Sequence, residues 1–441
     1  MDFKQMYQEK LVSAEKAASV IKSGDWVDYG WTTATPVAVD KAIAKRLPEL
    51  TDVNFRGGIL MWVPEIFKIE NPAEHMTWNS WHMGGIERKA IAQGFSYYAP
   101  IRYSELPRYY RESQNKPDVA VFQVSPMDEH GFFNFGPNAS HMAAVCETSK
   151  VVIVEVNENM PVCFGGTEEG VHISHVDMIV EGDNPAIAEM GGAAAASDVD
   201  EAVAKLILEE IPDGAVLSLG VGGVPFTVAN MLAQSDKTDL GCHTGTISDA
   251  FLALYKAGKL TNKKKEIDNG YSTWNLAMGS QELYDWLDNE PQLFHPADVD
   301  YVHSPYRIGE MKNVISINGG VELDLMGQEN AESAGTRQLS GIGGQMDFLE
   351  GAFRSEGGKG FICLASTHKK KDGSLKSNIV PFIPGGSTVS APRTMIQYVA
   401  TEYGIAKLTG LTLKERADAM IAIAHPDFRD ELRRYAEENF K

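Results

Sequence analysis

The chain has 441 residues, of which 43% are hydrophobic and 23% charged, a composition typical of a folded globular protein and not of a disordered one. Its length favours two domains, because a single hydrophobic core rarely grows beyond about 250–300 residues. The formal net charge of −20 argues against nucleic acid as a partner, since phosphate backbones bind to basic surfaces. A small anionic ligand is compatible with this charge where backbone amides and helix ends bind it.

The four cysteines form neither a C-x-x-C pair nor a Cys/His pattern typical of zinc. We expect free, buried thiols and no bound metal. The segment Met1–Glu9 is polar, with no apolar signal core. No segment approaches the ~18 consecutive apolar residues of a membrane helix. The sequence therefore predicts a cytoplasmic protein with no membrane partner.

The first half of the chain alternates between helical and strand patterns. The pattern predicts helices over Ser13–Ser23 and within Thr32–Ile43, and strands within Asp25–Gly30, Val53–Trp62, Asp118–Val124 and Val151–Val156. A turn-rich segment follows the strand that ends at Val124, and it carries three candidates for general acid/base chemistry, Asp128, Glu129 and His130. Acids and histidines in such loops are more often solvated or capping groups.

A run of small residues, Gly191–Ser197, predicts the boundary between a domain at 1–195 and a domain at 196–441. Ser197 is placed to cap the next helix, with Asp200 as its capping-box partner. Ala17–Val39 and Ala204–Leu232 share the order helix, Gly/Asp turn, strand, small-residue loop and helix. This similarity predicts a duplicated α/β unit.

The second half continues the alternation of strands and helices. Strands are predicted at Ala215–Leu219, Val314–Ile317 and Gly360–Ala365, and helices at Thr412–Ala424 and His425–Asn439. The fold class predicted for the whole chain is α/β, with two similar open α/β domains and mostly parallel sheets.

Three glycine segments stand out in the second half: Gly220–Pro225, Asn318–Gly320 and Gly341–Gly344. Glycine turns let backbone amides approach a phosphate or a developing oxyanion closely. Neither G-x-G-x-x-G nor the Walker pattern is present, which argues against nicotinamide and ATP, and no G-x-S-x-G elbow supports a serine hydrolase. Lysine runs at Lys263–Lys265 and Lys369–Lys371 are candidate phosphate contacts, although charge runs are more often solvated loops.

Several segments together are specific: SPMDEHGFFNFG, VVIVEVNENMP, GVGGVP, DLGCHT with ISD, GQENAES, QLSGIGGQMDF, TEYGIAKLTG and AIAHPDFR. In this order, over nearly the whole chain, they are similar to the acetyl-CoA hydrolase/transferase family. Within it, the chain resembles the CoA-transferases that act on butyryl-CoA or 4-hydroxybutyryl-CoA with acetate. The resemblance implies an active site in the cleft between the two domains, coenzyme A (CoA) as part of the substrate, and a homo-oligomer.

The resemblance also implies a ping-pong reaction. A glutamate carboxylate attacks the acyl-CoA thioester to form a mixed anhydride, and the CoA thiolate then attacks that anhydride to leave a glutamyl-CoA thioester. An incoming carboxylic acid takes the CoA by the reverse steps. Such covalent catalysis divides one difficult exchange into easier ones.

Site residues follow from the resemblance, motif by motif. The positions that match the family's CoA contacts are Gly222, Gly223, Val224, Pro225, Phe226, Gly320 and Gly343, with Gly344 beside the last. These glycines also have an alternative role as the residues that tight turns require. Tyr29–Thr35, which includes Trp31, matches the acyl side of the pocket.

One position departs from the family. The nucleophile segment of the family reads roughly D-L-G-x-H-[ST]-E, whereas this chain reads Asp239–Gly245, with Gly245 at the glutamate position. Glycine has no side chain and cannot carry CoA, so a thioester on a carboxylate is not expected.

Three explanations remain open for Gly245. The chain is a paralogue with altered chemistry, which uses another group, activates water or exchanges acyl groups directly; or it binds acyl-CoA without catalysis, alone or beside an active paralogue in a hetero-oligomer; or the glycine is a deliberate substitution. The leading function is therefore a CoA-transferase-like protein for short-chain acyl-CoA and acetate. The alternatives are an acyl-CoA-binding subunit and an acyl-CoA hydrolase.

Overall fold

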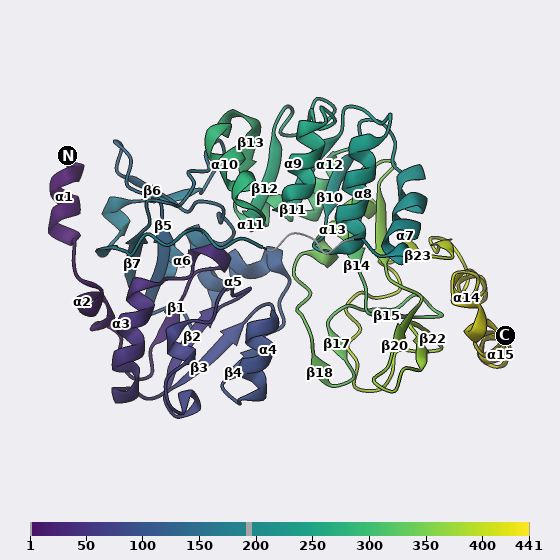
Figure 1. Cartoon of the computed structure of the whole chain (residues 1–441), viewed down its shortest axis with the longest axis horizontal. Coiled ribbons are helices and arrows are strands. Elements are labelled where there is room, and N and C mark those ends of the chain that lie inside the picture. The colour runs from purple at the N-terminus through teal and green to yellow at the C-terminus, as the bar shows by residue number, and fades with distance from the viewer. Residues whose placement is uncertain (1, 191–195, 441) are drawn as a thin grey trace. The chain divides into compact units, whose positions relative to one another are not determined.

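The computed structural model describes residues 2–190 and 196–440, so most of the predicted boundary run, residues 191–195, lies outside the described residues. The chain divides into two compact units (Figure 1). The first unit comprises Met1–Gly191 and Thr273–Val302, and the second comprises Gly192–Ser272 and His303–Lys441. Residues 273–302 are tied to the first unit by backbone hydrogen bonds, such as the 2.8 Å bond that the Ala277 N–H donates to the Pro137 carbonyl. The domain limits 1–195 and 196–441 stay a prediction.

The first unit is built on a parallel sheet with the strand order β4-β3-β2-β1-β5-β7-β9. Its strands are β1 (Trp26–Asp28), β2 (Val53–Gly57), β3 (Met76–Ser80), β4 (Ser96–Tyr98), β5 (Val119–Val124), β7 (Val151–Val156) and β9 (Met178–Glu181). Strands β5 and β7 are almost wholly buried, as their continuous apolar sequences predict. A small antiparallel pair, β6 (Phe132–Asn134) and β8 (Gly170–His172), lies outside this sheet.

The helices of the first unit are α1 (Phe3–Lys10), α2 (Ala14–Ala18), α3 (Ala38–Arg46), α4 (Gly85–Ala92), α5 (Leu106–Glu112) and α6 (Met142–Thr148). Residues 273–302 hold most of β12 (Ser272–Ala277), together with α10 (Gln281–Asn289), β13 (Phe294–Pro296) and α11 (Val299–Val302). None of the helices in the part of the chain that the structure describes is long and apolar enough to cross a membrane.

The second unit repeats this architecture. Its strands run in the order β11-β10-β14-β19-β23-β24 and are parallel except for the last pair. They are β10 (Val216–Leu219), β11 (Gly241–Ile247), β14 (Val314–Gly319), β19 (Lys359–Cys363), β23 (Tyr398–Thr401) and β24 (Gly404–Lys407). A smaller sheet has the order β16-β15-β22. Two hairpins, β17–β18 and β20–β21, lie between β16 and β22 in the sequence. These short strands are β15 (Glu322–Asp324), β16 (Glu329–Asn330), β17 (Ser333–Ala334), β18 (Arg337–Gln338), β20 (Thr367–Lys369), β21 (Leu375–Ser377) and β22 (Ile379–Val380).

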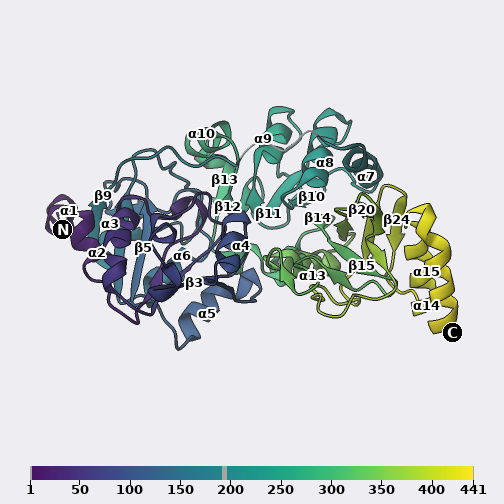
Figure 2. The same ribbon diagram turned by 60° about the horizontal axis from the view of Figure 1, so that its bottom comes forward.

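The helices of the second unit are α7 (Asp198–Glu209), α8 (Gly223–Gln234), α9 (Asp249–Lys256), α12 (Pro305–Glu310), α13 (Gln345–Arg354), α14 (Leu413–Ala422) and α15 (Pro426–Asn439). Helices α7 and α8 pack side by side, and α14 lies along α15 at the C-terminal end of the chain (Figure 2). Ser197 and Asp200 form the predicted capping box of α7.

The two units share one topology. In each, the first strand (β1 or β10) lies between the next strand in the chain and a row of three later strands, which gives β2-β1-β5-β7-β9 and β11-β10-β14-β19-β23; in the first unit β3 and β4 continue the sheet beyond β2. The predicted fold class and the duplicated α/β unit are therefore confirmed.

Three predicted elements of the first unit are shorter in the structure. The helix predicted over Ser13–Ser23 is limited to α2 (Ala14–Ala18), which Ser13 caps. The helix predicted within Thr32–Ile43 is a 3-10 turn at Thr32–Ala34 followed by α3, which begins only at Ala38. Thr35 is extended, because the residue before a proline avoids the helical region, and Pro36 therefore precedes the helix. The strand predicted at Val53–Trp62 ends at Gly57, near a left-handed turn at Ile59.

Candidate functional site

The carboxyl ends of β10, β11 and β14 meet at one edge of the second sheet, and the predicted site residues follow these ends. Leu217 of β10 pairs with Cys242 of β11 and with Ile315 of β14. The same register, continued by three residues, sets three residues level at this edge: Gly220, Gly245 and Asn318. In open α/β sheets this edge, at the strand where the order reverses, is the usual place for a ligand.

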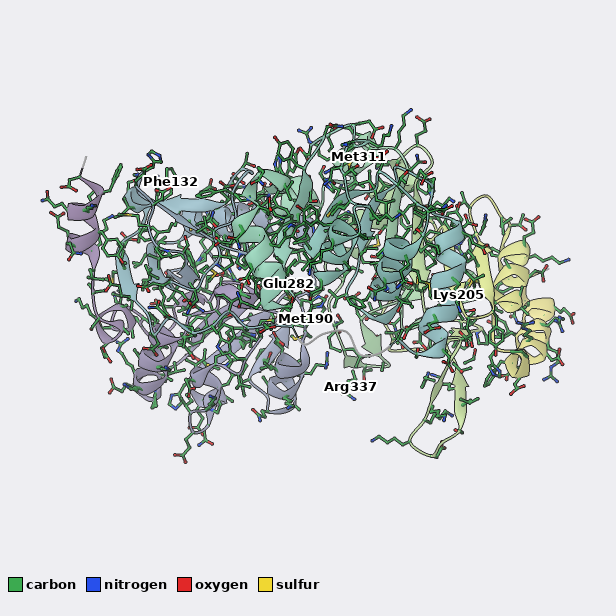
Figure 3. The ribbon with its side chains drawn as sticks, turned by 45° about the horizontal axis from the view of Figure 1, so that its top comes forward. Phe132, Met190, Lys205, Glu282, Met311 and Arg337 are labelled. Atoms are coloured by element: carbon green, nitrogen blue, oxygen red, sulfur yellow. The ribbon has the colours of Figure 1, made fainter. Side chains whose placement is uncertain are left out.

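The glycine turn after β10 leads directly into α8. Val221 is exposed (61%), and Gly222 has φ 153°, a backbone conformation that favours glycine. Gly223 is the first residue of α8, and a Cβ there would stand 2.7 Å from the Asp200 carboxylate. Helix α7, on which Figure 3 labels Lys205, brings that carboxylate close. The predicted residues Gly222–Phe226 therefore form the turn and the first turn of a helix, where N–H groups are free to bind an anion.

Gly245 lies near the carboxyl end of β11, so this part of the nucleophile segment is a strand. It is half-buried, between the buried Thr244 and the half-buried Thr246. The Thr244 hydroxyl donates a 3.3 Å hydrogen bond to the Thr246 carbonyl. The position that the family resemblance assigns to the nucleophile is thus at the sheet edge, and it offers only backbone atoms.

Gly320 follows the end of β14, and its N–H donates a 3.0 Å hydrogen bond to the Cys363 carbonyl. The space where its side chain would lie is filled. A Cβ would stand 2.8 Å from Ile362 Cγ2 and 3.2 Å from Glu329 Oε1. Gly320 is therefore required for packing as well as available at the edge.

Gly343 and Gly344 precede α13 and differ in role. Gly343 has φ 54°, the left-handed conformation that glycine adopts without strain. A Cβ on Gly344 would stand 2.0 Å from the ring of His303, so only glycine fits there. The buried His303 Nδ1 lies 3.4 Å from the buried Asp347 carboxylate.

Sequence reasoning did not single out Glu329, which lies within the GQENAES segment. Its side chain is fully buried, and Gln345 Nε2 lies 2.6 Å from both carboxylate oxygens. Burial raises the pKa of Glu329 to about 8, the Gln345 hydrogen bond lowers it, and the negative charge of Glu332 raises it further. The signal in the sequence is an acid between two glycine segments.

Two of the other candidate residues, Asp128 and Lys265, make structural hydrogen bonds. The Asp128 carboxylate accepts hydrogen bonds from the N–H groups of His130 and Phe132, so it stabilises an exposed turn. Lys265 is buried, its Nζ donates to the carbonyls of Cys242 and Tyr271 at 2.9 and 2.7 Å, and burial lowers its pKa to about 8. It is therefore not a solvated member of the Lys263–Lys265 run.

Trp31, in the predicted acyl-side segment, is buried and stacks on Tyr103 at 5.9 Å between ring centroids. All of Tyr29–Thr35 is buried within the first unit. The four cysteines are free, and three are buried, whereas Cys146 is half-buried.

Comparison with known proteins identifies the class of protein. The sequence profile of the acetyl-CoA hydrolase/transferase N-terminal domain matches residues 1–190, and that of the C-terminal domain of the same family matches residues 279–436. The chain belongs to the acetyl-CoA hydrolase/transferase family, an enzyme family, as its motifs indicated.

Individual relatives cover the whole chain. The butyryl-CoA:acetate CoA-transferase of Anaerostipes caccae is 57% identical over 99% of this chain and 98% of its own length. Among solved structures, RipA from Yersinia pestis is 34% identical with a TM-score of 0.89, over 99% of both chains. The 4-hydroxybutyrate CoA-transferase from Porphyromonas gingivalis is 32% identical with a TM-score of 0.80, over 100% of both chains.

Proposed function

We propose that this chain is an acyl-CoA:carboxylate CoA-transferase that moves CoA between a short-chain acyl group, such as butyryl, and acetate. The 57% identity to a butyryl-CoA:acetate CoA-transferase, over nearly both full lengths, carries this proposal. The strand ends of the second unit support it, since the glycine residues matched to CoA contacts follow β10 and β14 or precede α13.

The proposed CoA contacts are the turn and first helical turn at Gly222–Phe226, together with Gly320, Gly343 and Gly344. Free N–H groups at the start of α8 suit a phosphate or an oxyanion. The side-chain space of Gly320 and Gly344 is already filled by neighbouring side chains, so these two residues would contribute backbone atoms. We also propose a homo-oligomer and no metal requirement.

The proposal is tested by mixing the purified chain with butyryl-CoA and isotopically labelled acetate. Labelled acetyl-CoA, formed at the rate at which butyryl-CoA disappears, is the expected result. Free CoA released without labelled acetyl-CoA would identify a hydrolase instead. Tight binding of butyryl-CoA by calorimetry, with neither product, would identify a binding subunit.

Gly245 is the strongest argument against the proposed function, because it stands where the family has its nucleophilic glutamate. A Gly245→Glu variant separates the explanations if the natural chain shows no exchange. Exchange gained by this variant would show that only the nucleophile is missing. Exchange by the natural chain shows instead that the reaction proceeds without a side chain at position 245.

A further inference from the structure

A fully buried carboxylate lies at the sheet edge where CoA is proposed to bind, and the proposed contacts leave it without a role. Glu329 begins β16, whose partner strand β15 follows Gly320 closely in the sequence. The Cβ that Gly320 lacks would stand 3.2 Å from Glu329 Oε1. Glu329 therefore lies beside two of the three glycine segments, because its carboxylate also accepts a hydrogen bond from Gln345, directly after Gly344.

Few groups stabilise the ionised form of the buried Glu329 carboxylate. Among the described residues, Gln345 is the only side chain that donates a hydrogen bond to it. The charge of Glu332 acts against its ionised form. A buried carboxylate held by one neutral amide is costly when ionised, and a poorly stabilised carboxylate is a better nucleophile than a well-solvated one.

Gln345 covers this carboxylate. It is half-buried, so its side chain reaches from the surface of the unit inward to Glu329. It is the first residue of α13, directly after the glycine pair. Rotation of this one side chain would remove both side-chain hydrogen bonds to the Glu329 carboxylate, and side-chain rotations occur in nanoseconds or less where the residue is exposed.

We propose that Glu329 is the carboxylate that accepts CoA in this chain, in the role that the family gives to the position of Gly245. This reverses the expectation from Gly245 alone that no carboxylate thioester forms. This inference rests on the proposed transferase function. Strands β11 and β14 are separated by β10, so about 10 Å separates the two strand ends at the usual spacing between strands. The reacting thioester is then expected at the β14 end of the site, beside Gly320.

The steps balance without water or redox chemistry. A Glu329 oxygen attacks the thioester carbon, the carbon–sulfur bond breaks, and CoA leaves as a thiolate. The thiolate attacks the Glu329 carbonyl carbon of the mixed anhydride, the acyl group leaves as its carboxylate, and a glutamyl-CoA thioester remains. The acceptor carboxylate repeats these steps in reverse, which returns Glu329 as a free carboxylate.

The test is to trap that thioester. The full-length protein is incubated with butyryl-CoA, treated with sodium borohydride, which reduces a glutamyl thioester to an alcohol, and digested for peptide mass mapping. The expected result is reduction at Glu329 that depends on butyryl-CoA. Reduction at a different acidic residue, or no reduction in a protein that exchanges label, would overturn the inference.

Variants separate this inference from the proposed function. Glu329→Gln keeps the shape and is expected to lower exchange at least 1000-fold, whereas Glu322→Gln, a buried acid on the adjoining β15, keeps exchange within about threefold. Glu329→Asp keeps a carboxylate and is expected to retain trapping at a reduced rate. Full exchange by Glu329→Gln would overturn the role of Glu329 and leave the transferase function standing, and absence of exchange in the natural chain would overturn both.

Discussion

The two units share the connection from the central strand to the next helix, but they differ in what binds the first N–H groups of that helix. In the first unit, the helix after the central strand begins against the buried Glu155 of β7, whose carboxylate accepts hydrogen bonds from the N–H groups of Val37, Ala38 and Val39 at 2.9–3.0 Å. In the second unit, the equivalent helix α8 begins at a glycine turn with no side-chain cap, and the turn is exposed.

This difference shows which copy of the duplicated unit is suited to a ligand. When a protein carboxylate already accepts hydrogen bonds from the first N–H groups of a helix, those groups are not free to bind an anionic ligand. The first N–H groups of an uncapped helix are free to do so. The two buried glutamates differ in the same sense. Glu155 has three backbone donors and serves the fold, while Glu329 has one side-chain amide.

The largest loss of stability is expected from removing the buried carboxylate of Glu155 in the first unit. Glu155→Ala leaves three buried N–H groups without an acceptor and is expected to lower the free energy of unfolding by about 2–4 kcal/mol. Urea unfolding measures this, with the exposed Glu158→Ala as control. A loss below about 0.5 kcal/mol would show that these hydrogen bonds do not hold α3 in place.

The second prediction concerns pH and sharpens the contrast between the glutamates. Glu329 must be ionised to attack, so exchange is expected to rise about 50-fold from pH 6 to pH 8 if its pKa is about 8. Burial is the main cause of this raised pKa, and Glu332→Gln removes the smaller contribution of a nearby charge, so it is expected to move the rise slightly to lower pH. A flat profile in the natural chain contradicts the assignment of Glu329.

The same pKa has a consequence for folding that requires no activity. The pKa of Glu329 is raised in the folded state, so the folded chain binds more protons than the unfolded chain. Its contribution to stability is therefore complete below about pH 4.5 and is lost as pH rises towards about 8. Glu329→Gln is expected to remove this contribution, so that the free energy of unfolding falls by about 1–3 kcal/mol less than in the natural chain as pH rises. Urea unfolding of both proteins over this pH range measures the difference, and the same pH dependence in both would argue that Glu329 is ionised throughout.

The cost in stability of replacing a glycine at the site is expected to depend on whether other atoms already fill the space of the new side chain. Gly344→Ala forces a Cβ against His303 and is expected to cost about 1–3 kcal/mol. Gly319→Ala has nothing within 4 Å of the new atom and is expected to cost less than about 1 kcal/mol. Thermal unfolding compares them, and equal losses would mean that the ring of His303 moves aside readily.

Much of this fold is readable from local patterns, and part of the site is not. Strand β7 and the Ser197 cap were predictable because a β-branched apolar run and a capping box act over a few residues. Pro36 is a local signal for the late start of α3, but the Glu155 carboxylate that accepts hydrogen bonds from the first N–H groups of this helix lies more than 100 residues away, and no local pattern contains it. The burial of Lys265 likewise depends on carbonyls from two other segments.

Glu329 was missed for a similar reason. Its sequence neighbours are small and polar, which suggests a surface loop, and only the pairing of β16 with β15 carries it to Gly320. The position of Gly222 was predictable because its glycine turn follows a predicted strand, whereas Gly245 lies within β11, a strand that the sequence did not predict. The CoA contacts stay a proposal.

The return of residues 273–302 to the first unit has a consequence for synthesis. The ribosome completes most of the first unit by residue 191, but the Pro137 and Ser140 backbone groups that bond to this later segment wait until it has been translated. About eighty residues of the second unit emerge in between. The first unit therefore cannot finish folding as an independent N-terminal piece, and a gene cut near residue 195 is expected to yield two fragments that fold only when expressed together.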